Sequence, residues 1–109
     1  PSHCKLMKEA SNKFREKINE VKINTPTIPV IQNYNAQISD DPITIKENLI
    51  NQLTNPVQWY KTMNSINKYN GIIIECGPGK VLSGLAKLNG ANKIFSTSSL
   101  NFDELKDFI

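Results

Sequence analysis

Residues 71–82, which read GIIIECGPGKVL, decide the fold of this chain. The short apolar run at residues 72–76 predicts a strand, and its continuous apolar character is typical of a parallel strand covered on both faces. The glycines and proline at residues 77–79 predict a tight turn. Apolar side chains in residues 81–88 then predict a helix that packs back on the strand and ends at Gly90.

On the C-terminal side of this unit, residues 93–97 predict a further strand. Asn101 and Glu104 have the spacing of a capping box, which predicts a short last helix carrying the apolar side chains of residues 105–109. Two strands joined through a helix are expected to pair in parallel, with a right-handed crossover. This part of the chain is therefore of the α/β class.

The N-terminal part of the chain predicts a helix followed by a short strand. Residues 4–21 place apolar side chains along one stripe of a helix. The members of that stripe are Met7, Ala10, Phe14, Ile18 and Val21. Residues 28–32 predict a short buried strand, in which only the part after Pro29 can pair freely.

Two more helices are predicted before residue 71. Asp41 followed by Pro42 indicates a helix start, because a carboxylate caps the free N–H groups and proline is tolerated in the first turn. This helix is expected to end near Thr54. The same signal at residues 55–56 predicts another helix, which leaves the first at a sharp corner and stops at Gly71.

Composition fits one α/β domain over residues 1–109, with a short, mostly parallel sheet covered by helices. No apolar run is long enough to span a membrane.

Cys4 and Cys76 are too few for a disulfide framework, which favours a reducing compartment, the cytoplasm, and buried free thiols. The net charge of +3 lacks a dense basic cluster, which argues against nucleic acid, but a weakly positive surface would suit an acidic protein partner.

His3 is the one histidine of the chain and the first candidate for acid–base chemistry near neutral pH. No methionine precedes it, and the sequence around it continues a fold. We therefore expect a C-terminal part of a larger enzyme, with the partners of His3 upstream. From composition alone, a structural role for this lone histidine is favoured over a catalytic one.

A metal site formed by His3 with Cys4 and Cys76 is disfavoured, because there is no Cys-x-x-Cys pair and adjacent residues usually point apart.

Residues 77–80, GPGK, lie between a predicted strand and a predicted helix, which is the setting of a phosphate-binding loop. A Walker loop has four residues between its glycines and a serine or threonine after the lysine. Here one residue separates the glycines, and Val81 follows the lysine. A dinucleotide fingerprint would need glycine or alanine at Leu82, and Pro78 removes one N–H donor. A structural turn is favoured, and nucleotide binding stays as an alternative.

Three motifs together carry a family resemblance: PSHC at residues 1–4, NQLTNPVQW at residues 51–59 and ECGPGKVLSGL at residues 75–85. Their order and spacing resemble the C-terminal part of the malonyl-CoA:acyl carrier protein transacylases of bacterial-type fatty acid synthesis. The resemblance covers Pro1 to about Ser99. It implies the C-terminal portion of an α/β-hydrolase-like acyltransferase core, from which the ferredoxin-like subdomain is absent.

The resemblance also implies a ping-pong transfer of malonyl from coenzyme A, through a serine ester, to the phosphopantetheine thiol of acyl carrier protein. His3 would be the general base, the backbone carbonyl of Gln52 would orient its ring, and Ser2 would border the pocket. No cofactor or metal is implied, since the coenzyme A thioester is a substrate, and a monomer is expected. The serine elbow, the oxyanion hole and the carboxylate-binding arginine belong to the family's upstream region.

These 109 residues alone are therefore expected to be inactive. The alternative to the acyltransferase is a catalytically silent remnant, or a fragment that only docks acyl carrier protein.

Overall fold

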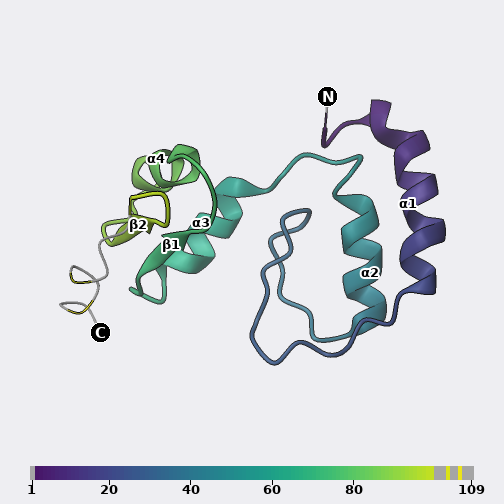
Figure 1. Ribbon diagram of the computed structural model, residues 1–109, viewed down its shortest axis with the longest axis horizontal. Helices are drawn as coiled ribbons and strands as arrows, with labels where there is room; N and C mark the ends of the chain where they lie inside the picture. The colour runs from purple at the N-terminus through teal and green to yellow at the C-terminus, as the bar shows by residue number, and fades with distance from the viewer. Residues whose placement is uncertain (1, 100–102, 104–105, 107–109) are drawn as a thin grey trace. The chain divides into compact units, whose positions relative to one another are not determined.

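The computed structural model describes residues 2–99, 103 and 106. The chain forms two compact units, Pro1–Thr62 and Met63–Ile109, which are described separately (Figure 1). Within the described residues, no helix combines the length and the apolar character needed to cross a membrane. The predicted last helix and its capping pair fall outside the described residues, apart from Asp103 and Lys106.

Two helices that lie side by side form the first unit (Figure 1). A short 3-10 turn, η1 (Lys5–Met7), leads into α1 (Lys8–Glu20), and α2 (Pro42–Asn51) follows after a long connection. Asp41 caps α2 as predicted, since its carboxylate accepts hydrogen bonds from the N–H groups of Ile43 and Thr44. The Thr44 hydroxyl, then the Thr44 and Ile43 N–H groups, hold the pKa of Asp41 below its ordinary value.

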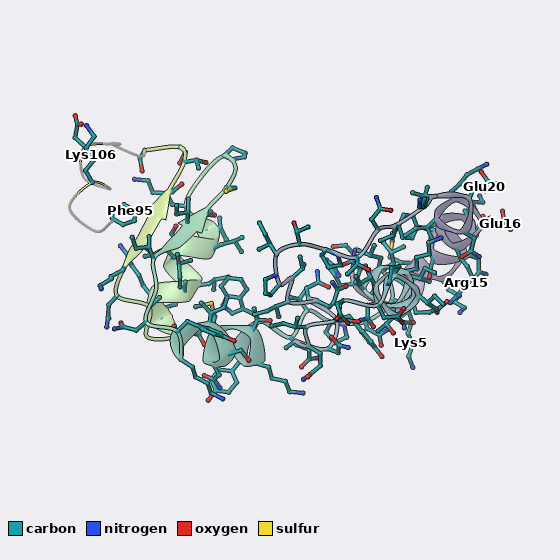
Figure 2. All side chains as sticks on the ribbon, turned by 90° about the horizontal axis from the view of Figure 1, so that it is seen from below. Lys5, Arg15, Glu16, Glu20, Phe95 and Lys106 are labelled. Carbon is teal, nitrogen blue, oxygen red and sulfur yellow. The ribbon has the colours of Figure 1, made fainter. Side chains whose placement is uncertain are left out.

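The core of this unit lies between α1 and α2. Ile18 of α1 and Ile50 of α2 are buried, and the Ser11 hydroxyl donates to the Ile50 carbonyl at 3.4 Å. Arg15 forms two hydrogen bonds to Glu47, of 2.6 and 3.1 Å, but both side chains are partly exposed, so this pair contributes little to stability. Figure 2 shows other charged side chains of α1, including Glu16 and Glu20, on the exposed side of the helix.

The strand predicted at residues 28–32 is wrong. Ile28 is 73% exposed, and this part of the chain belongs to the irregular connection between α1 and α2. Only an isolated antiparallel bridge joins Ile31 to Ile38. The chain folds back on itself here, because the Gln32 N–H donates to the Gln37 carbonyl at 2.8 Å. Prolines at 26 and 29 remove two N–H donors from this stretch, which disfavours a regular ladder along it.

The helix start predicted at residues 55–56 is also wrong. α3 (Trp59–Asn67) begins three residues later and ends before Gly71, with the backbone of Asn70 at a positive φ of 47°. Asn55 belongs instead to the end of α2, because its side-chain amide donates to the Asn51 carbonyl at 2.8 Å. The alternation of strands and helices predicted from residue 28 onward therefore holds only in the second unit.

The second unit contains a two-stranded parallel sheet. β1 (Ile73–Glu75) pairs with β2 (Ile94–Ser96), with Ile73 opposite Ile94. α4 (Val81–Leu88) joins the strands and packs on β2, so the predicted strand–turn–helix–strand order is confirmed. In the described part of the chain the sheet is not covered on both faces as predicted, because Ile74 is 44% exposed. The fold is α/β, with a short parallel sheet and helices.

Candidate functional site

The imidazole of His3 reaches the end of α2, although 49 residues separate it from its contact in sequence. Its Nδ1 lies 2.7 Å from the backbone carbonyl oxygen of Gln52, which is the C-cap residue of α2. A carbonyl oxygen only accepts hydrogen bonds, so this contact requires the ring hydrogen on Nδ1. Nε2 is then left with a lone pair that can take a proton. The arrangement suits a neutral base whose tautomer is set by its neighbour.

The backbone of His3 is held in an unusual conformation. Its φ is 56°, in the left-handed region that residues with a Cβ seldom adopt. Directly after it, the Met7 N–H closes the η1 turn on the Cys4 carbonyl at 3.0 Å. A positive φ at a non-glycine residue costs free energy and often marks a functional position. The ring is thus fixed from two sides, by the strained turn before α1 and by the end of α2.

The other candidate residues are placed less tightly. Ser2 is exposed beside His3 in sequence, and Cys4 is half-buried. Cys76 is exposed, so the prediction of buried thiols is wrong for this residue, which lies just past the end of β1. Among the described residues, no three histidine, cysteine or acidic side chains gather in a way that could hold a metal ion.

Glu75 at the end of β1 is the residue that sequence reasoning missed. It is buried, and its carboxylate accepts hydrogen bonds from the Leu82 and Ser83 N–H groups, at 3.0 and 2.9 Å, and from the Ser83 hydroxyl. These groups form the first turn of α4. The sequence signal that could have identified Glu75 is an acidic residue at the end of an otherwise apolar strand, seven residues before a helical turn.

The position of the Glu75 carboxylate argues against a phosphate-binding loop at Gly77–Lys80. The N–H groups that would bind an anion at the start of α4 already bind this carboxylate, and a second negative charge beside it would be repelled. Gly77 and Gly79, with φ of 135° and 85°, supply a turn that residues with a Cβ would strain. The hydroxyls of Ser96 and Ser98 donate to the Gly79 carbonyl and hold that turn closed. The geometry is that of a structural turn.

We expect the second unit to lose stability in acid through Glu75. The Ser83 hydroxyl, and after it the Ser83 and Leu82 N–H groups, lower the pKa of this carboxyl despite the opposing effect of its burial. A lowered pKa stabilises the fold above the ordinary value of a glutamate, about 4.3, and that contribution is lost as pH falls through the folded value. Urea unfolding midpoints measured from pH 7 to pH 3 should therefore fall with pH.

The matched variants for this test are Glu75→Gln and Glu16→Gln. Glu75→Gln should be less stable than the parent at pH 7, and its midpoint should fall less between pH 5 and pH 3. Glu16 is exposed on α1, so Glu16→Gln should leave the midpoint at pH 7 unchanged. An unchanged acid dependence in Glu75→Gln would assign the acid lability to another group.

Comparison with known proteins gives one consistent answer, although no family model matches the chain. The chain is 42% identical over 89 residues to the malonyl CoA-acyl carrier protein transacylase of Salmonella typhimurium, covering 80% of this chain and 28% of that protein. The crystal structure of FabD from Acinetobacter baumannii superposes with a TM-score of 0.84 at 46% identity, over 98% of this chain and 34% of the other.

A second similar structure is that of PlMCAT:AntF, a type II PKS acyl-carrier protein in complex with its malonyl-transacylase. It matches with a TM-score of 0.85 at 33% identity, over 92% of this chain and 33% of that chain. The chain thus spans about a third of the length of the proteins it matches. The resemblance predicted from the three sequence motifs is confirmed by these matches. Over most of its length the chain is therefore homologous to the C-terminal part of the malonyl CoA-acyl carrier protein transacylases.

Proposed function

We propose that the protein containing this chain transfers a malonyl group from coenzyme A to the phosphopantetheine thiol of acyl carrier protein, with His3 as general base. The observation that carries the proposal is the 2.7 Å contact between His3 Nδ1 and the Gln52 carbonyl, which leaves Nε2 free to take a proton. The names of the related proteins, one of them in complex with an acyl carrier protein, support the substrates.

In the first half reaction, Nε2 of His3 takes the proton of a serine hydroxyl as the serine oxygen bonds to the malonyl carbonyl carbon. The C–S bond to coenzyme A then breaks, and the imidazolium returns its proton to the leaving sulfur. The Gln52 carbonyl carries a partial negative charge, so it stabilises the imidazolium as well as fixing the tautomer. The serine lies outside residues 1–109, because no serine here has the Gly-x-Ser-x-Gly setting.

The second half reaction uses the same base for the carrier thiol. Nε2 takes the thiol proton, the carrier sulfur bonds to the malonyl carbonyl carbon, the ester C–O bond breaks and the proton returns to the serine oxygen. The coenzyme A thioester is a substrate, and no cofactor or metal takes part. Ser2, next to His3, borders the acyl pocket.

Residues 1–109 are, in this proposal, the C-terminal segment of the larger subdomain of an α/β-hydrolase-like core. The ferredoxin-like subdomain, the serine elbow and the arginine that binds the malonyl carboxylate are supplied by polypeptide outside these residues. The whole protein works as a monomer in the cytoplasm.

The test is acyl transfer by the complete protein, followed by intact-mass measurement. Incubation with malonyl-CoA should add the mass of one malonyl group, and addition of phosphopantetheinylated carrier protein should move that mass to the carrier. The separate 109-residue chain, treated in parallel, should acquire no malonate, because it lacks the serine. A complete protein that binds carrier protein but never takes up malonate would support the silent docking fragment instead.

A further inference from the structure

The backbone carbonyl of Gln52 can accept a hydrogen bond from His3 only if no other donor occupies it. The donors that could compete with His3 lie in the residues just after α2. In an α-helix the carbonyl of residue i accepts the N–H of residue i+4. The residue four positions after Gln52 is Pro56, which has no N–H to donate. The i+4 donor to the Gln52 carbonyl is therefore absent from the chain, which leaves the Asn55 N–H, at i+3, as the remaining backbone donor that a helical turn could offer it.

The end of α2 satisfies its other last carbonyls within its own turn. The Leu53 N–H donates to the Ile50 carbonyl at 3.3 Å, and the Thr54 N–H donates to the Asn51 carbonyl at 3.2 Å. The Asn55 N–H would continue this series of i to i+3 bonds onto the Gln52 carbonyl, but the series stops at Thr54. Among the described residues, no backbone N–H donates to the Gln52 carbonyl, and His3 Nδ1 is its one hydrogen-bond donor.

Asn55 fixes the chain at the point where the series stops. Its side-chain amide donates to the Asn51 carbonyl at 2.8 Å and to the Thr54 hydroxyl at 3.2 Å. Residue 55 is thereby tied to the last turn of α2 through its side chain. The half-buried amide joins the Thr54 N–H and the Thr54 hydroxyl as a third donor to the Asn51 carbonyl, and it holds the chain in a direction that leaves the Gln52 carbonyl open to His3.

We propose that Asn55 and Pro56 are positioning residues for His3: Pro56 withholds the donor that would compete for the Gln52 carbonyl, and Asn55 locks the helix end in that open form. The effect that we expect on catalysis rests on the proposed function. The effect that we expect on the resting protein, namely which ring nitrogen of His3 carries the hydrogen, does not depend on that function.

The direct readout is the ¹⁵N NMR spectrum of the His3 ring in the complete protein, assigned by its loss in His3→Gln. The parent should show the ring hydrogen on Nδ1 at a pH where the ring is neutral. Pro56→Ala introduces an N–H that competes for the Gln52 carbonyl, and Asn55→Asp keeps the side-chain shape but removes the donor to Asn51. Both variants should show a mixture of the two tautomers.

The kinetic readout is malonyl transfer by the same variants. A poorly oriented base slows the chemical step, so kcat should fall by up to about 100-fold while KM changes little. Pro29→Ala is the matched control, since Pro29 is also an exposed proline but lies far from the end of α2 in sequence. This control should retain the parent tautomer and the parent kcat, whatever it does to stability.

A single Nδ1–H tautomer with parent kcat in both Pro56→Ala and Asn55→Asp would overturn the inference. If Pro56→Ala does not fold, Asn55→Asp alone decides it. If the parent protein transfers no malonate at all, the proposed function fails, and the tautomer of the resting ring still decides whether these two residues position His3.

Discussion

Replacing His3 with alanine in the complete protein should lower kcat for malonyl transfer by about 100- to 10,000-fold, the range that a positioned general base contributes. The serine would keep its hydroxyl but lose the group that takes its proton, and the leaving sulfur would lose its proton donor. Within the described residues, the side-chain hydrogen bond that disappears is the one to the Gln52 carbonyl, which is worth about 1 kcal/mol of stability. Activity should therefore collapse while the fold persists.

The control for His3→Ala is Gln52→Ala. The proposed role of Gln52 belongs to its backbone carbonyl, which alanine retains, so this variant should keep most of the parent rate. Rates are measured as malonyl transfer to carrier protein, with circular dichroism to establish that both variants fold. Parent-like turnover in His3→Ala would remove His3 from the mechanism. A large loss in Gln52→Ala with an intact fold would place the role in the side chain instead.

The elements that sequence reasoning placed correctly are those with strong local signals. The apolar stripe predicted α1, the Asp41–Pro42 pair predicted α2, and the run before the glycine turn predicted β1 and α4. Each signal depends on residues a few positions apart. The approach of His3 to Gln52 joins residues 49 positions apart, and only the family resemblance, not periodicity, predicted it.

The errors arose where one local signal fits two structures. A short apolar run such as residues 28–32 reads as a strand, but in the described part of the chain it makes only the isolated bridge from Ile31 to Ile38, and Ile28 stays exposed. An asparagine followed by proline can begin a helix, but at residue 55 the preceding helix lies within reach, and the amide bonds to Asn51. Glu75 could not be placed, because its partners become neighbours only when the turn at Gly77–Lys80 closes.

The second large effect is expected from Ile50→Ala, because Ile50 is among the most deeply buried side chains of the chain, at 2% exposed. It lies in α2 against α1, where the Ser11 hydroxyl also reaches its carbonyl. Truncation of a buried isoleucine to alanine removes packed atoms and leaves a cavity, at a cost of about 2–5 kcal/mol. Domains are stable by about 5–15 kcal/mol, so this one change should remove a large share of the free energy of unfolding.

Ile43→Ala gives the matched comparison, since it makes the same substitution on the same helix at a side chain that is 75% exposed. Its free energy of unfolding, measured with urea, should stay within about 0.5 kcal/mol of the parent. Both variants keep the Asp41 cap and the contact at Gln52, so the difference between them isolates the packing of α2 against α1. Equal stabilities would mean that this packing does not hold the helix end that His3 contacts, and that the strained turn at His3 must be stabilised from elsewhere.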